Sequence, residues 1–289
     1  MEKLFKTSLI AMGTAAAITA FLVFMNQEEK DGLTLENGDS NSNSSDEYTT
    51  SNSHELSSDS TEDDNSNGTV SSPRTLSDYL KILKHDDNSD VYVMKKLEST
   101  QVLLTISAYS ESYPLLEQLD VIGIVLENMN YILAQSVTSP NQDSLLIKLG
   151  LFLGNLLSSK NSQLKVIDAR FVPTLLSLIN DTNEVRADFA LLCLQNLSLN
   201  EEGAEEIVIS QGVPSYVTLL NDASKPIGLK KQALYSILNL CLINRVKSMI
   251  YENQELRVTL DTIGSGTSPD LSRLTSRILI LLSQPDDEE

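Results

Sequence analysis

The sequence predicts an all-α protein whose helices stack into a solenoid of about four repeats. Three observations lead to this prediction. Beyond Leu76, apolar residues recur at spacings of three, four and seven in nearly every segment, which is typical of amphipathic helices. No stretch alternates apolar and polar residues over the length of a strand. Similar segments also return at a nearly constant interval along the chain, which indicates a repeat architecture.

The composition limits the classes of function. The 289-residue chain has a formal net charge of −19, two His and no Trp. Such an acidic chain cannot neutralise many phosphates, which argues against nucleic-acid binding. Its two cysteines, Cys193 and Cys241, cannot form a disulfide scaffold, and we expect them to be buried, inert thiols. We find no motif of a P-loop, a serine hydrolase or a zinc protease. We therefore expect no enzyme activity, cofactor, metal or small-molecule substrate.

An uncharged apolar stretch lies near the N-terminus. Residues 7–25 form a run of 19 residues without a charge, and a helix of this length just spans a hydrocarbon core of about 30 Å. The run is longer than the apolar core of a signal peptide, which is usually about 7–15 residues. We therefore predict a retained, single-pass transmembrane anchor over residues 1–26, rather than a cleaved signal.

The charges that flank this anchor bear on its orientation. Lys3 and Lys6 precede the apolar run, and acids follow it. Because positive charges favour the cytosolic side, this asymmetry places the remainder of the chain in the secretory lumen. A short, Ala-rich apolar segment is also similar to anchors of the mitochondrial outer membrane, which would leave the chain facing the cytosol. Both locations remain open at this point.

An acidic, polar segment follows the anchor. Residues 27–74 are rich in Ser, Asn, Asp, Glu and Thr, and residues 28–75 alone carry twelve acids and two bases. Such a segment cannot bury enough apolar surface to offset the entropy of ordering. We therefore predict a disordered linker that holds the folded region away from the membrane. Asn43 and Asn67 begin N-glycosylation sequons, which would be modified only in the lumen.

Residues 75–285 contain the repeat. Three segments, LFLGNLLS, LCLQNLSL and YSILNLCL, align on a central Asn, and these asparagines stand 41 and 43 residues apart. They are Asn155, Asn196 and Asn239. Pro173 and Pro214 each lie 18 residues after the first two and open a further amphipathic stretch, as Pro does near a helix N-terminus. One pair of helices cannot bury its apolar face, so the copies must stack into one core.

A more divergent copy precedes these three. Thr105 takes the place of the central Asn there, and half-copies begin and end the region. The interval of 50 residues from Thr105 to Asn155 is wider than the other two. We attribute the difference to a long loop between repeats at Ser136–Asp143.

The repeating unit resembles the armadillo repeat. It combines an apolar helix carrying Leu-x-Asn-Leu, a polar turn, and a Pro-initiated segment such as ARFVPTLLSLI (169–179) or SQGVPSYVTLL (210–220). The resemblance implies a right-handed, armadillo-like α-solenoid over residues 75–285. It also implies a non-catalytic adaptor that binds a protein partner and, in this chain, is held at a membrane. The acidity of the region favours a basic or extended partner.

The resemblance also points to candidate binding residues. In armadillo proteins that bind extended peptides, the Asn of the long helix lines the concave face and pairs with the peptide backbone. By this resemblance the candidates are Asn155, Asn196 and Asn239, together with Leu151, Leu192 and Tyr235 four residues earlier, where the family often has Trp. In an alternative interpretation, the three asparagines bridge neighbouring repeats. The sequence leaves both open.

A second function is compatible with the same resemblance. Nucleotide-exchange factors of the heat-shock chaperone ATPase are also short armadillo arrays, and residues 244–263 resemble their terminal repeat. The alternative is therefore a chaperone cofactor in the secretory lumen, whose concave face would clamp a nucleotide-binding lobe.

Overall fold

The computed structural model describes residues 75–266 and 268–284. Within these ranges the chain forms helices and no strand, which confirms the all-α prediction. The anchor predicted over residues 1–26 (its apolar run is 7–25), the linker over 27–74 and the sequons of Asn43 and Asn67 lie outside the described residues. Among the helices of the described ranges, none has the length and apolar character needed to cross a bilayer.

The helices follow the chain as a leading pair and four sets. The leading pair is α3 (Leu76–Lys84) and α4 (Asp90–Ile106). Each set has a short first helix, a middle helix and a third helix that ends the repeat. The sets are η1 (Ser110–Ser112) with α5 (Tyr113–Gln118), α6 (Val121–Leu133) and α7 (Pro140–Leu156); α8 (Lys160–Asp168), α9 (Val172–Leu178) and α10 (Glu184–Leu197); α11 (Glu201–Ile209), α12 (Gly212–Asn221) and α13 (Ile227–Leu242); and α14 (Asn244–Ile250), α15 (Gln254–Gly264) and α16 (Pro269–Ser283).

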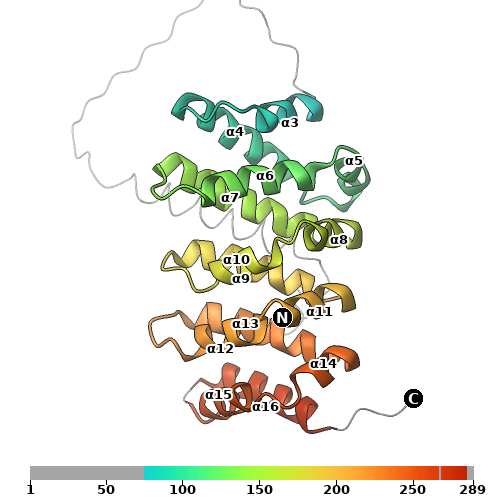
Figure 1. Ribbon diagram of the computed structural model, residues 1–289, viewed down its shortest axis with the longest axis vertical. Helices are drawn as coiled ribbons and strands as arrows, with labels where there is room; N and C mark the ends of the chain where they lie inside the picture. Colours follow the sequence, from blue (N-terminus) through green and yellow to red (C-terminus); the bar gives the residue numbers. More distant parts are fainter. Residues whose placement is uncertain (1–74, 267, 285–289) are drawn as a thin grey trace, which may run out of the picture.

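The sets stack one upon another into an elongated array (Figure 1). Helices α4, α7, α10, α13 and α16 each pack against the next and form what we call the long-helix row. The first helices of the sets lie along one side of the array, on the right in Figure 1. The loops between middle and third helices lie along the opposite side. The loop between α3 and α4 (residues 85–89) lies on this side too, and we call these loops (residues 85–89, 134–139, 179–183 and 222–226) the loop edge. The predicted solenoid of about four repeats is thus confirmed.

The loop predicted at Ser136–Asp143 is wrong in its place and extent. Helix α7 begins at Pro140, where Ser139 and Gln142 form a capping box: Gln142 N donates to Ser139 Oγ (3.2 Å) and Ser139 N donates to Gln142 Oε1 (2.9 Å). The extra residues lengthen the helices instead, because α6 has 13 residues where α9 has 7.

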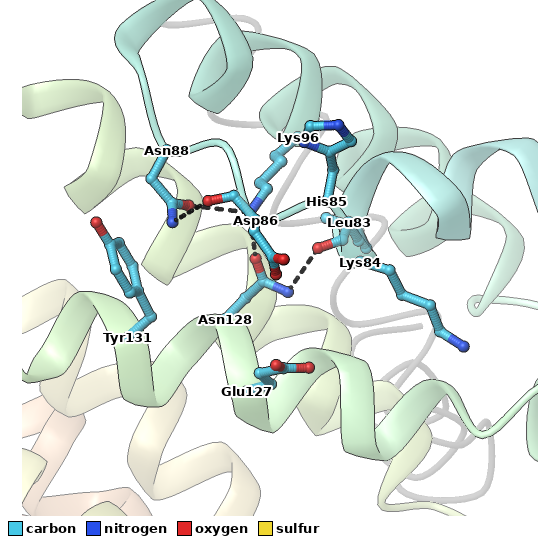
Figure 2. A pocket seen from close by; sticks show the side chains of 9 residues that line it. All are labelled: Leu83, Lys84, His85, Asp86, Asn88, Lys96, Glu127, Asn128 and Tyr131. Atoms are coloured by element: carbon cyan, nitrogen blue, oxygen red, sulfur yellow. Dashed lines mark hydrogen bonds between the residues drawn. The ribbon is translucent and has the colours of Figure 1, made fainter.

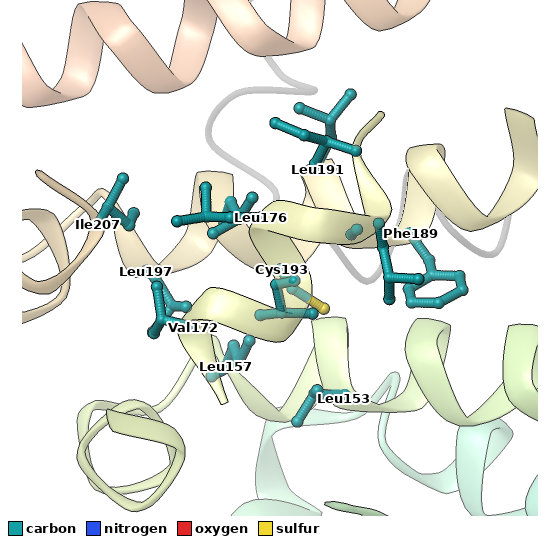
Figure 3. Packing of buried hydrophobic residues seen from close by; sticks show 14 of the residues in the cluster. Leu153, Leu157, Val172, Leu176, Phe189, Leu191, Cys193, Leu197 and Ile207 are labelled. Atoms are coloured by element: carbon teal, nitrogen blue, oxygen red, sulfur yellow. The ribbon is translucent and has the colours of Figure 1, made fainter. Parts of the chain in front are cut away.

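A single apolar core runs through the array. Figure 3 shows its centre, where Leu153 of α7, Phe189 of α10 and Leu176 of α9 lie among other buried side chains. Helix α10, for example, packs against α9 of its own set and against α7 and α13 of the neighbouring sets. This arrangement is the physical reason for the repeat pattern, because no set could bury its apolar surface alone.

Both cysteines are buried in this core without a disulfide. Burial raises the pKa of the Cys193 thiol and that of Cys241, the latter to about 12. Both thiols are therefore protonated near neutral pH, where the thiolate is the reactive form. The expectation that both thiols are buried is confirmed.

Candidate functional site

The three asparagines of the repeat lie at the junctions of the long-helix row. The side-chain amide of each donates a hydrogen bond to the preceding repeat: Asn155 Nδ2 to Ser107 Oγ (2.9 Å), Asn196 Nδ2 to the Gly154 carbonyl oxygen (2.8 Å), and Asn239 Nδ2 to Ser198 Oγ (3.0 Å). Asn155 and Asn196 are only 1% and 2% exposed, and Asn239 is half-buried. Each amide therefore ties one repeat to its predecessor.

The acceptor depends on the residue two positions after the asparagine place of the preceding repeat. Ser107 and Ser198 occupy this position after α4 and α10, and each offers a hydroxyl. Leu157 occupies it after α7 and offers none. Asn196 instead donates to the carbonyl of Gly154, which lies in the last turn of α7, where carbonyl groups lack helical donors.

These contacts agree with the interpretation in which the asparagines bridge neighbouring repeats. The buried amides of Asn155 and Asn196 face the adjacent repeat and not solvent. Leu151 is buried, while Leu192 and Tyr235 are half-buried on the same row. Partner binding by these six residues stays a prediction, and Tyr235 and Asn239 offer the accessible surface it would need.

The bridging role leads to a stability prediction. We expect Asn196→Ala to lower the free energy of unfolding by about 1–3 kcal/mol, because the buried Gly154 carbonyl would lose its donor. Asn239→Ala should cost less, since Asn239 and its surroundings remain partly hydrated. Urea unfolding followed by circular dichroism measures both. Equal losses for the two variants would contradict this ranking.

The row also carries polar pairs between neighbouring helices. Lys148 Nζ of α7 donates to Gln101 Oε1 of α4. Farther along the row, Gln232 Nε2 of α13 donates to Asp188 Oδ1 of α10 (2.7 Å), and Lys231 forms an ion pair with Asp270 of α16 (2.8 Å). The row therefore carries acids, bases and amides at half-buried positions, and Lys231 and Gln232 stand about one turn before Tyr235 on α13.

A cavity of about 270 Å³ opens at the N-terminal end of the loop edge (Figure 2). The end of α3, the loop 85–89, α4 and α6 line it. Most of the residues that line it have polar side chains, and they include Asp86, Asn88, Lys96, Glu127, Asn128 and Tyr131. We call it the edge cavity. The sequence analysis did not identify it.

A buried lysine holds the walls of the edge cavity in place. Lys96 is 3% exposed, and its Nζ donates to Asn88 Oδ1 (3.0 Å) and Asn128 Oδ1 (3.1 Å). Asn128 Nδ2 in turn donates to the Leu83 carbonyl oxygen (3.0 Å) at the end of α3. Burial lowers the pKa of Lys96, and the nearby Asp86 and Glu127 oppose this effect. The network thus joins α3, the loop, α4 and α6.

Comparison with known proteins identifies the fold. No protein-family model matches the chain, and no curated relative does. Among solved structures, a designed armadillo repeat protein in complex with the peptide (KR)4 superposes with a TM-score of 0.60 at 20% identity, over 72% of this chain and 82% of that one. A computationally designed armadillo repeat protein for modular peptide recognition gives 0.59 at 20% identity, over 71% and 81%. This chain has the armadillo fold.

A natural armadillo protein shows the same likeness. The armadillo repeats only protein of Plasmodium falciparum superposes with a TM-score of 0.55 at 14% identity, over 72% of this chain and 92% of that one. Identities this low establish the armadillo fold alone. The armadillo resemblance read from the repeated asparagines is thus confirmed at the level of fold.

The Asp188 carboxylate, in the long-helix row, leads to a prediction about how the stability of the chain depends on pH. Burial raises its pKa above the ordinary value, and the hydrogen bond from Gln232 opposes this only in part. The folded state therefore binds this proton more tightly than the unfolded state. The stabilisation from this proton is present at pH values below the pKa of Asp188 in the unfolded state. It is lost as the pH rises through the pKa of Asp188 in the folded state.

The Asp188→Asn variant tests this pH dependence, because it removes the titrating carboxyl while its amide oxygen still accepts the hydrogen bond from Gln232. We expect the natural chain to gain stability relative to the variant as the pH falls from 7 to 4. The midpoint difference should favour the variant at pH 7 and shrink as the pH falls. Parallel pH profiles would contradict the prediction.

Proposed function

We propose that this chain is a membrane-anchored armadillo adaptor that binds a protein partner through its long-helix row and carries out no chemistry. The observation that carries the proposal is the continuous row from α4 to α16, with half-buried polar and aromatic side chains along it. Two designed proteins of the same fold, by their descriptions, bind or are built to recognise peptides. The uncharged run of residues 7–25 supports the anchor.

Charge supports a basic or extended partner. Residues 75–284 contain twenty-three acids and seventeen bases. The excess of acids lies within residues 75–224, which contain nineteen acids and nine bases. Complementary charge speeds the encounter of two proteins and selects against partners of the same sign. An acidic array of this kind therefore favours a basic partner segment that lies along the row.

Site-specific photo-crosslinking tests where the partner binds. A photo-reactive phenylalanine analogue replaces Tyr235, in the long-helix row, or Tyr251, an exposed residue that follows α14 on the side of the first helices. We expect a discrete adduct of higher mass from position 235 in living cells and none from position 251. Equal adducts from both positions, or adducts from 251 alone, would contradict binding through the row.

Membrane extraction and protease protection test the anchor and its orientation. We expect a C-terminally tagged chain to stay with membranes in alkaline carbonate, and a chain that lacks residues 7–25 to be released. Release of the full chain would contradict the anchor. A tag digested on intact organelles indicates a cytosolic face, as on the mitochondrial outer membrane.

A protected tag with glycan on Asn43 or Asn67 instead indicates the secretory lumen. The chaperone-cofactor alternative is then tested by binding to the chaperone ATPase domain. Only a nucleotide-exchange factor should bind in a manner that depends on the nucleotide. Binding that is insensitive to nucleotide would leave the adaptor as the function.

A further inference from the structure

Neighbouring long helices meet through the same positions at successive junctions. The seventh residue before the central asparagine contacts the preceding long helix. The Phe189 ring lies against Gly150 of α7, and Gln232 Nε2 donates to Asp188 Oδ1 of α10 (2.7 Å). The third residue before the asparagine does the same, because Cys193 Sγ donates to the Gly150 carbonyl oxygen (3.6 Å). Together with the asparagines themselves, these positions form the side of a long helix that faces its predecessor.

Helix α4 exposes this side, which we call the α4 end face (Val91, Met94, Glu98, Val102 and Thr105). Thr105 takes the asparagine place, and Glu98 and Val102 lie seven and three residues before it. Glu98 and Thr105 are exposed and Val102 is half-buried, since α4 is the first long helix of the described residues. Val91 and Met94 continue the same side and are 71% and 41% exposed. The outer face of a terminal repeat is normally polar, but three of these five residues are apolar.

Helix α16 exposes an arginine-rich side at the opposite end of the array (Figure 1). Arg273, Arg277 and Ile280 recur at spacings of four and three, opposite the buried side of the helix. We call these three residues the α16 end face. Ile280 is 58% exposed, and Arg277 forms no ion pair within residues 75–266 and 268–284. Arg273 Nη2 lies 3.6 Å from Asp270 Oδ1, and its side chain is 78% exposed.

We propose that the α4 end face of one chain packs on the α16 end face of a second copy. The two arrays then join end to end, and α4 follows α16 in the long-helix row as α7 follows α4. The Glu98 carboxylate meets the guanidinium groups of Arg273 and Arg277, which suit a carboxylate partner. The apolar residues of the α4 end face cover Ile280 and leave water.

The charges of the two faces select this pairing. Lys95 borders the α4 end face, but its ammonium lies over the Tyr92 ring (5.3 Å). Asp270 borders the α16 end face and pairs with Lys231 (2.8 Å). One carboxylate on α4 therefore faces two guanidinium groups on α16. Either face paired with itself would bring like charges together, which weakens binding. The contact is thus heterologous, and because each copy keeps one free end, it builds open chains.

Crosslinking between two differently tagged full chains in mild detergent tests the pairing. One chain carries Glu98→Cys and the other Arg277→Cys, and a short bis-maleimide joins them, while the two natural cysteines are buried. We expect a product that contains both tags. We expect none between two chains that both carry Glu98→Cys. We also expect none when Ser177→Cys, at an exposed position of α9 within the array, replaces Arg277→Cys.

Sedimentation velocity of the full chain measures the strength of the association. We expect the mean mass to rise with concentration. Glu98→Lys and Arg277→Glu should each weaken the association about tenfold, and the double variant should recover most of it, because opposite charges meet again. Asp168→Lys reverses an exposed acid of α8, away from both ends, and should associate like the natural chain. Circular dichroism confirms that each variant is folded.

Three results would overturn the proposal. They are a mass that does not change with concentration, charge reversals at the two ends that act no more strongly than Asp168→Lys, and equal crosslinking in the three pairs of cysteine variants. Crosslinking between two Glu98→Cys chains alone would also overturn it, in favour of a symmetric dimer. None of these results bears on partner crosslinking through Tyr235, so the end-to-end contact and the adaptor function can fail independently.

Discussion

Phe189→Ala is expected to lower the free energy of unfolding by about 3–5 kcal/mol, the usual cost of removing a buried aromatic ring. Phe189 is fully buried in α10 at the centre of the core (Figure 3). Its ring lies against Gly150 of α7 so closely that a Cβ on Gly150 would be 2.3 Å from Phe189 Cδ2 and 2.4 Å from Cγ. The cavity left by the ring would lie between two repeats, which limits how far the site can collapse.

A double-mutant cycle with Gly150 tests this contact directly. Gly150→Ala alone should cost about 1–3 kcal/mol, because the added methyl group displaces the ring. In the Phe189→Ala background the methyl group enters space that the ring has left, so the same change should cost little or should stabilise. Urea unfolding of the four proteins gives the coupling. Additive losses would show that the ring does not pack on Gly150.

The fold was predictable because its pattern is local and repeated. The helical periodicity and the three central asparagines recur at a fixed position in each unit, so each copy supports the others. The extra residues before Asn155 were misplaced for the opposite reason. They lengthen α6 and α7, and an amphipathic helix that gains turns keeps the same period, so the pattern could not separate a longer helix from a loop.

The candidate site was less predictable, because its contacts join different repeats. The family resemblance assigned Asn155 and Asn196 to a binding surface, and the structure directs both amides to the preceding repeat. Which hydrogen bond each amide forms depends on a residue far away in the sequence, namely Ser107, 48 positions before Asn155, and Gly154, 42 positions before Asn196. No short-range pattern contains that information.

The edge cavity did leave a signal in the sequence that could have been used. Lys96 stands three residues after the buried Val93 on the apolar face of α4, and Asn128 stands among the buried residues of α6. Polar residues at core positions require partners. The pattern could therefore have indicated a buried polar network, although the cavity beside it follows only from the packing of α3 on α6.

Gly203→Ala is expected to lower the free energy of unfolding by about 3 kcal/mol, at the upper end of the usual cost of overpacking. Gly203 lies in the first turn of α11, and its N–H donates to Asn200 Oδ1 (2.8 Å). A Cβ there would be 2.2 Å from the Leu197 carbonyl oxygen and 2.9 Å from its carbon. Because these are backbone atoms, no side-chain rotation can relieve the clash, and the turn from α10 to α11 must open.

Gly228→Ala is the matched control. Gly228 lies near the start of α13, and a Cβ there meets no atom within 4 Å. The higher helix propensity of Ala and the reduced freedom of the unfolded chain should stabilise this variant by up to about 1 kcal/mol. The same substitution is therefore expected to destabilise the chain at Gly203 and to stabilise it at Gly228. The urea midpoints of the two variants test this difference.

The loss of stability expected for Gly203→Ala bears on function as well. The turn after α10 sets how the third repeat stacks on the second, and this stacking keeps α10 and α13 adjacent in the long-helix row. A Gly203→Ala chain that still folds should therefore give less crosslinking through Tyr235, while Gly228→Ala should give the normal amount. Normal stability and crosslinking in Gly203→Ala would mean that the turn can widen without disturbing the row.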